Sequence, residues 1–201
     1  MLLMTAANKI TTGRFFLSIV YLGILTYAIS KKESWDIGTW NLAVLIAFVL
    51  FFIAAASDWV DGYIARKYGE VTHFGRIADP FVDKIIVCGS LTFFLSMEPL
   101  APYFPAWLVA IVLGREFLVH GIRAVAEAEG IEFGANFLGK LKFVVQAITV
   151  GTALWYASYL HGVIWAKWVL VVTVVATGLI TVLSGLVYIF QARKLFTGNK
   201  I

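Results

Sequence analysis

Six long apolar stretches dominate this sequence and restrict what the chain can fold into. They cover roughly residues 13–30, 40–61, 77–97, 105–125, 139–160 and 165–190. Each is close to the roughly 20 residues that an α-helix needs to cross the hydrocarbon core of a bilayer. Only 14% of the residues are charged, whereas soluble domains carry about 25%. The sequence therefore predicts an all-α integral membrane protein with six transmembrane helices.

The connections between these stretches are short, and they carry charges and turn-forming residues, as at positions 31–34 and 98–105. We find no internal repeat, no low-complexity tract and no change of composition that would mark a second domain. Residues 1–201 are therefore expected to form one membrane-embedded domain. The single cysteine, Cys88, excludes a disulfide within the chain.

The distribution of positive charge predicts the orientation in the membrane. With six spans, every Lys and Arg except Lys31, Lys32 and Lys167 falls on the side that holds both termini. Positive charge is concentrated on the cytoplasmic side of membrane proteins, so both termini are expected in the cytoplasm. Five tryptophans are expected to form an aromatic belt at the opposite interface: Trp35, Trp40, Trp107, Trp165 and Trp168. The net charge of +4 does not indicate nucleic-acid binding, because the chain has no soluble basic domain.

Four aspartates lie at the cytoplasmic ends of the second and third predicted spans. Asp58 and Asp61 are three residues apart, and Asp79 and Asp83 are four apart. Each spacing places both members of a pair on one face of a helix. Since a short hairpin joins the two spans, the pairs are expected to converge.

Carboxylates grouped at membrane depth would repel one another and would be costly to bury. Hard oxygen ligands of this kind suit Mg²⁺, Mn²⁺ or Ca²⁺, and two divalent ions would balance four negative charges. Two metal ions held by carboxylates commonly stabilise phosphoryl displacement. The alternative is that the aspartates form salt bridges with Arg66, Lys67, Arg76 and Lys84, which would explain one pair more readily than four residues on two faces.

The residues around the aspartates form an extended motif. It reads Asp58-Trp-Val-Asp61-Gly62-Tyr-Ile-Ala65-Arg66, then eight residues, then Gly75-Arg-Ile-Ala-Asp79-Pro-Phe-Val-Asp83. This run resembles the D-x2-D-G-x2-A-R-x8-G-x3-D-x3-D signature of the CDP-alcohol phosphotransferases. The resemblance implies a six-helix fold, a homodimer, a cytoplasm-facing site and a CDP-linked lipid as donor.

The resemblance also assigns roles to individual residues. It implies that Asp58, Asp61, Asp79 and Asp83 bind two Mg²⁺ or Mn²⁺ ions, and that Asp83 is also the general base for the acceptor hydroxyl. It implies a binding site for CDP-diacylglycerol formed by Asn8, Thr11, Gly62, Ala65, Arg66, Thr72 and Gly75. The planar guanidinium of Arg66 suits phosphate oxygens.

The acceptor must be recognised elsewhere, and the fourth and fifth spans carry unusual charges. Arg115 and Glu116 interrupt the fourth span, Arg123 follows eight residues later, and Lys140 and Lys142 open the fifth. We expect Arg115, Arg123, Lys140 and Lys142 to form a pocket for the phosphate of the acceptor, lined also by His120. The alternative is that these side chains extend to the lipid head groups.

The runs Gly114-Arg115-Glu116 to Arg123 and Gly139-Lys140-Leu-Lys142 resemble the bacterial phosphatidylglycerophosphate synthases within this family. So does Asn8-x2-Thr11-x2-Arg14. The resemblance implies transfer of a phosphatidyl group to glycerol 3-phosphate, with release of CMP, at a bacterial plasma membrane.

Other activities remain open at this point. Within the family they are the synthases of phosphatidylinositol phosphate, cardiolipin and phosphatidylserine, of which a cationic pocket disfavours the serine enzyme. Outside the family, an ion-coupled transporter could use membrane carboxylates. Transporters commonly show internal repeats and helices broken near the midplane, whereas the acidic residues here lie at one interface.

Overall fold

The structure is a computed structural model that describes residues 6–68, 73–130 and 137–196, with side chains at residues 8, 10–57, 78, 81–130 and 137–193. Within these ranges the chain forms helices and turns, without a β-strand. The helices are α1 (Ala6–Ser30), α2 (Ile37–Tyr68), α3 (His73–Phe94), α4 (Ala106–Ala128), α5 (Phe137–Trp155) and α6 (Ile164–Phe196). A 3-10 turn, η1 (Ala101–Tyr103), precedes α4, and a π-helical turn, η2 (Tyr156–Leu160), extends α5.

Local sequence explains where several helices begin and end. The Asp36 side chain caps α2, because Oδ2 accepts a 2.9 Å hydrogen bond from the Thr39 amide and Oδ1 accepts one of 2.6 Å from Thr39 Oγ1. Pro105 directly precedes α4. After α4, Gly130 adopts a left-handed conformation with φ of 71°, which stops a helix at low cost because glycine has no Cβ.

Within the part of the chain that the structure describes, four helices are long and apolar enough to cross a membrane. These candidate spans are Ile10–Ser30, Ile37–Ser57, Phe137–Leu160 and Ile164–Arg193. Helices α3 and α4 fall outside this set, and both carry charged residues in their middle turns, including Asp83 on α3 and Arg115 on α4. The predicted all-α membrane fold with six helices is confirmed.

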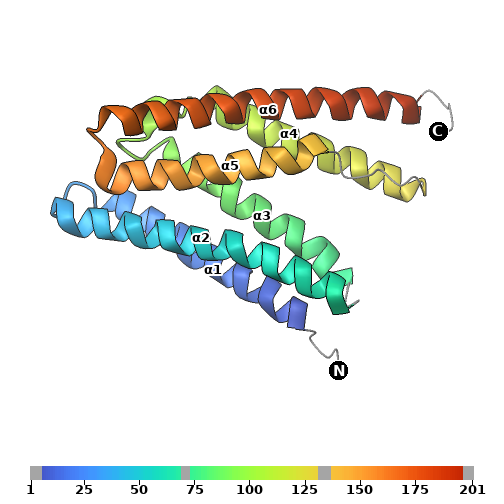
Figure 1. The fold of residues 1–201 in the computed structure, drawn as a ribbon, viewed down its shortest axis with the longest axis horizontal. Helices are drawn as coiled ribbons and strands as arrows, with labels where there is room; N and C mark the ends of the chain where they lie inside the picture. Colours follow the sequence, from blue (N-terminus) through green and yellow to red (C-terminus); the bar gives the residue numbers. More distant parts are fainter. Residues whose placement is uncertain (1–5, 69–72, 131–136, 197–201) are drawn as a thin grey trace.

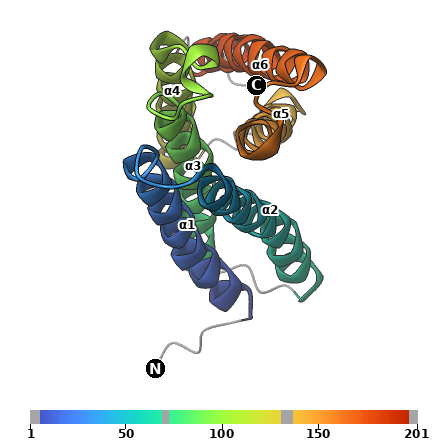
Figure 2. The ribbon, with the colours of Figure 1, turned by 90° about the vertical axis from the view of Figure 1, so that its left-hand side faces the viewer.

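Consecutive helices run in opposite directions, so the start of α1, the end of α2 and the end of α6 lie at one end of the bundle (Figure 1). We call this the terminus end. Helix α1 packs against α2 and α3, α4 and α5 pack against α6, and α2 packs against α5. Figure 2 shows α3 in the middle, with α1 and α2 on one side and α4 and α6 on the other. We refer to α1–α3 as the first half and to α4–α6 as the second half.

Three helices, α1, α2 and α6, extend well beyond the apolar stretches that predicted them. Helix α1 begins seven residues before the expected position 13, and α2 and α6 continue past positions 61 and 190. Hydropathy detects only the part of a helix that can lie in lipid, whereas backbone hydrogen bonds continue where polar side chains can reach water. These extensions all lie at the terminus end (Figure 1).

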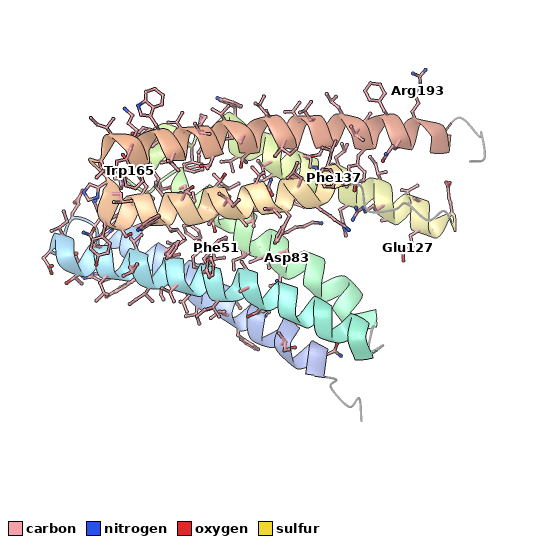
Figure 3. All side chains as sticks on the ribbon, in the orientation of Figure 1. Phe51, Asp83, Glu127, Phe137, Trp165 and Arg193 are labelled. Carbon is pink, nitrogen blue, oxygen red and sulfur yellow. The ribbon has the colours of Figure 1, made fainter. Side chains whose placement is uncertain are left out.

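The predicted aromatic belt is only partly correct. Trp107, Trp165 and Trp168 are exposed, and Figure 3 shows Trp165 at the end of the bundle opposite Glu127 and Arg193. Trp40, however, is buried. Its Nε1 donates a 3.2 Å hydrogen bond to the Ala28 carbonyl, and the Lys32 ammonium lies 4.0 Å from its ring centroid. Trp40 therefore joins α2 to α1 instead of facing lipid.

Candidate active site

A cavity of about 770 Å³ lies between helices α2 to α6. The charged residues predicted from the sequence meet in its lining: Asp83 of α3, Arg115, Glu116 and Arg123 of α4, and Lys140 and Lys142 of α5. His120 also lines it, as expected, and Tyr188 of α6 adds an aromatic wall. The structure thus brings the proposed base and all four proposed acceptor cations to one cavity, although they come from three different helices.

The four motif aspartates lie on two helices that end and begin at the terminus end. Asp58 and Asp61 are in the last turns of α2, and Asp79 and Asp83 lie between the start and the middle of α3. The helical backbone keeps each pair on one face. The side chains of Asp58, Asp61 and Asp79 lie outside the described residues. Among the side chains that are described, His, Cys, Asp and Glu form no group of three or more, so the metal site stays a prediction.

The predicted contacts to CDP-diacylglycerol fall in the same region. Gly62, Ala65 and Arg66 lie in the last turns of α2, and Gly75 lies in the first turn of α3. Their side-chain environment and the whole of Thr72 are outside the described residues. Their roles in donor binding also remain predictions.

Helix α1 presents three polar residues, Asn8, Thr11 and Arg14, at successive spacings of three. All three are buried, although they are polar and Thr11 and Arg14 lie in a candidate membrane span. Polar groups are buried in such a setting only when they have partners. Asn8 and Thr11, predicted to contact the donor, therefore face the protein interior and not lipid.

Arg14 is also part of the site. The motif Asn8-x2-Thr11-x2-Arg14 contains it, but the sequence alone predicted no role for this residue. Its Nη2 donates a 2.5 Å hydrogen bond to Asp83 Oδ1, and its Nε donates one of 3.3 Å to the Ala54 carbonyl. The Arg14 side chain is only 3% exposed, compared with 24% for Asp83. Arg14 therefore holds the proposed base from behind, on the side away from solvent. The N-x2-T-x2-R spacing was the available signal, because it places Arg14 on the same face as Asn8.

Glu116 divides the four proposed acceptor cations into two kinds. Its Oε1 accepts hydrogen bonds from Lys142 Nζ and, at 3.2 Å, from Arg115 Nη1. Lys142 is buried with this carboxylate, so its charge is already balanced. Arg115 also donates from Nε to Ser184 Oγ at 3.2 Å. Its Nη2 is buried without a hydrogen-bond partner in the described part of the chain, so the protein leaves this donor unused.

Tyr188 holds both arginines of α4, and nothing in the sequence singled it out. Its hydroxyl accepts a 2.6 Å hydrogen bond from Arg123 Nη2. The guanidinium carbons of Arg115 and Arg123 each lie 5.3 Å from its ring centroid, within the range of a cation–π interaction. The predicted last span is thus more than a lipid-facing helix. A tyrosine inside an apolar helix gives no signal of this kind in the sequence.

Gly139 leaves the room that Tyr188 needs. A Cβ atom at this position would lie 3.0 Å from the tyrosine hydroxyl oxygen. Any larger residue would therefore push Tyr188 towards the arginines or away from them. The glycine that precedes Lys140 and Lys142 in the sequence consequently has a steric role in shaping the cavity.

Comparison with known proteins identifies relatives along most of the chain. Residues 4–189 match the family model described as CDP-alcohol phosphatidyltransferase. The chain is 39% identical over 149 residues to a CDP-diacylglycerol–glycerol-3-phosphate 3-phosphatidyltransferase of Bacillus subtilis, covering 73% of this chain and 75% of the relative. A protein of the same name from Rickettsia typhi is 33% identical, covering 78% and 84% of the two chains.

A third relative covers more of the sequence. A probable phosphatidylglycerophosphate synthase of Mycobacterium tuberculosis is 32% identical over 189 residues, which are 94% of this chain and 81% of the relative. The family match includes the aspartate motif, the α4 and α5 cations and Tyr188. On this evidence the chain belongs to the CDP-alcohol phosphatidyltransferase family.

Proposed function

We propose that this enzyme transfers the phosphatidyl group of CDP-diacylglycerol to glycerol 3-phosphate, forming phosphatidylglycerophosphate and releasing CMP. The observation that carries the proposal is the meeting of Asp83 with Arg115, Arg123, Lys140 and Lys142 in one cavity. An alcohol that also bears a phosphate needs a base and cations within a few ångströms of each other. The names of the relatives from three bacterial groups support the same acceptor.

Enzymes of this family generally depend on a divalent metal. Asp58, Asp61, Asp79 and Asp83 would hold the metal, and their oxygen-only donor set suits two Mg²⁺ or Mn²⁺ ions. The bound ions would supply charge neutralisation at the donor pyrophosphate and the leaving phosphate. Gly62, Ala65, Arg66, Thr72 and Gly75 would bind the CDP portion next to these aspartates, together with Asn8 and Thr11 from α1.

Asp83 would accept the proton of the attacking hydroxyl. The hydroxyl oxygen forms a bond to the phosphorus that carries the diacylglycerol, the bond from that phosphorus to the CMP oxygen breaks, and the proton moves to the Asp83 carboxylate. Arg14 holds this carboxylate through Oδ1, so its orientation is fixed before the acceptor arrives. Positioning of this kind lowers the entropic part of the barrier.

Arg115, Arg123 and Lys140 would bind the phosphate of the acceptor. The Arg115 Nη2 atom has an unused donor, and Arg123 is held beside it by Tyr188. Lys140 is exposed at the cavity lining. Lys142, paired with Glu116, would favour phosphate binding indirectly, because it offsets the negative charge of that carboxylate.

The lining of the cavity includes Asp83 and the cations of α4 and α5, and with six spans most Lys and Arg fall on the side that holds both termini. We infer that the termini and the cavity face the cytoplasm of a bacterium, with the chain as one multi-pass domain in the plasma membrane. A soluble acceptor would enter from the cytoplasm while the acyl chains of the donor stay in the bilayer. A homodimer is the expected assembly.

The test is an acceptor screen with the purified full chain in detergent, Mg²⁺ and CDP-diacylglycerol. Glycerol 3-phosphate, inositol phosphate, serine and phosphatidylglycerol are offered separately, and CMP release is measured. We expect release with glycerol 3-phosphate and a rate at least about tenfold lower with the others. Release with inositol phosphate alone would keep the family chemistry and overturn the acceptor, and no release with any acceptor would overturn the proposed activity.

A further inference from the structure

Glu116 is a buried carboxylate that lies beside the cations of the cavity. It is 9% exposed, lies on α4 directly after Arg115, and lines the cavity. Both of its cationic partners, Lys142 and Arg115, donate to the same oxygen, Oε1. Within the described residues, Oε2 accepts no hydrogen bond, so half of this carboxylate is available to a molecule in the cavity.

The charge of Glu116 determines what that molecule can present to it. An ionised carboxylate only accepts hydrogen bonds, and it repels a phosphate at close range. Glu116 therefore works against anion binding at its own position, although it stands beside Arg115. A hydroxyl group is the neutral donor that satisfies Oε2 without disturbing the two cations on Oε1.

The proposed acceptor carries one such hydroxyl to spare. Glycerol 3-phosphate has a phosphate for Arg115, Arg123 and Lys140, a primary hydroxyl for Asp83, and a secondary hydroxyl on the carbon between them. Glu116 and Asp83 both line the cavity. Arg115 Nη1 lies 3.2 Å from Glu116 Oε1, so a phosphate bound at Arg115 would place the neighbouring carbons of the acceptor close to Glu116.

We propose that Glu116 is the specificity-determining residue for the acceptor's secondary hydroxyl, which it binds through Oε2. This inference rests on the proposed function. It explains why a buried carboxylate occupies a phosphate-binding cavity, where it would otherwise weaken the site. A polar group that is built to bind a substrate hydroxyl discriminates strongly against an analogue that lacks it, because the group is then left unpaired.

The experiment compares two acceptors that differ only in that hydroxyl. These are glycerol 3-phosphate and the monophosphate of 1,3-propanediol, which keeps the primary hydroxyl, the carbon chain and the phosphate. For the wild-type enzyme we expect kcat/KM to be roughly 10- to 100-fold higher with glycerol 3-phosphate. In Glu116→Ala this ratio should fall to within about threefold of one, because the analogue no longer leaves a group unpaired.

Glu116→Gln serves as a second variant in case Ala, which leaves Lys142 and Arg115 without their anion, does not fold. The amide keeps one oxygen acceptor but loses the charge, so the ratio should fall between those of wild type and Ala. Glu127→Ala is the matched control, since Glu127 lies on the same helix and lines the same cavity, and within the described residues it makes no ion pair with the cations. Its ratio should equal that of the wild type.

A merely structural role for Glu116 would lower kcat/KM for both acceptors by the same factor and leave the ratio unchanged, which would overturn the inference. Equal use of both acceptors by the wild type, within twofold, would overturn it without any variant. The proposed function fails in a different way, namely by the absence of CMP release with either acceptor.

Discussion

The two halves of the molecule hold their charged groups in different ways. In the second half, three cations have partners from their own half: Glu116 for Arg115 and Lys142, Ser184 for Arg115, and Tyr188 for Arg123. In the first half, the motif aspartates lie in the last turns of α2 and between the start and the middle of α3, and among the described side chains Asp83 forms an ion pair with Arg14. The protein's own side chains therefore hold the cations of the second half in place.

This difference suggests a division of labour between the halves. Arginines that are already fixed lose little entropy when they bind a phosphate, so the second half can select an acceptor from solution. The motif supplies four aspartates to the first half, and Arg14 pairs with one of them, Asp83. The first half is therefore suited to complete its site with divalent ions and the donor pyrophosphate, as we propose above.

The largest effect is expected from Asp83→Asn, which tests the first half. The amide cannot take the proton of the acceptor, and loss of a general base typically costs 10²- to 10⁴-fold. We expect kcat to fall about 10³-fold or more, while CDP-diacylglycerol binding, measured by calorimetry, falls far less. Asp36→Asn, at the opposite end of α2, is the control. Near-normal turnover in Asp83→Asn would remove Asp83 from the role of base.

The next largest effect is expected from substitutions of Tyr188, which test whether this residue preorganises the second half. Tyr188→Phe leaves Arg123 without its hydroxyl partner, and Tyr188→Leu also removes the ring under both arginines. We expect the KM for glycerol 3-phosphate to rise about tenfold in the Phe variant and further in the Leu variant. The KM for the donor should stay unchanged. Tyr159→Phe, an exposed tyrosine of η2, is the control, and equal changes in both KM values would contradict the separation of the two sites.

The sequence predicted the parts of this arrangement that depend on periodicity and motif spacing. The six helices, the pairing of the aspartates on helix faces and the cations of α4 and α5 all follow from residue types at fixed intervals. What it did not predict are contacts across sequence separations of about 65 to 70 residues. The Arg14–Asp83 pair and the Arg123–Tyr188 bond depend on which helices become neighbours, and an isolated helix pattern does not contain that information.

A smaller effect, on stability, is expected at the contact between α5 and α6. Hydroxyl groups form much of this contact, whereas aromatic and aliphatic side chains form the contact between α1 and α2. Thr149 Oγ1 lies 2.8 Å from Thr177 Oγ1, and Gln146 and Thr152 bond to Thr181 and Thr173. Thr149→Val keeps the shape and removes the bonds. Single interhelical hydrogen bonds in membrane proteins contribute about 0.6 kcal/mol on average, so we expect a loss of that order in detergent unfolding.

Activity per folded molecule should stay unchanged in Thr149→Val, because the residue does not line the cavity. Val145→Ala on the same helix has no hydroxyl to lose and is the comparison for general packing. A loss of acceptor affinity in Thr149→Val would mean that the hydroxyl contacts also set the positions of the cations. In that case preorganisation of the second half would extend well beyond Tyr188.

The smallest effect concerns Asp36, a described aspartate of the first half that lies far from the cavity. The Thr39 hydroxyl and then the Thr39 amide donate hydrogen bonds that lower the pKa of this exposed carboxyl below its ordinary value. A carboxyl with a lowered pKa in the folded state stabilises the protein above the pKa of the unfolded chain, and this contribution is lost as the pH falls through the folded pKa. Asp36→Ala should therefore unfold at a slightly lower temperature than wild type at pH 7. The unfolding temperatures of the two proteins should converge below about pH 4, with kcat unchanged at pH 7.

A large loss of turnover in Asp36→Ala would show that acidic residues of the first half matter for more than the cavity, and the division between the two halves would no longer hold.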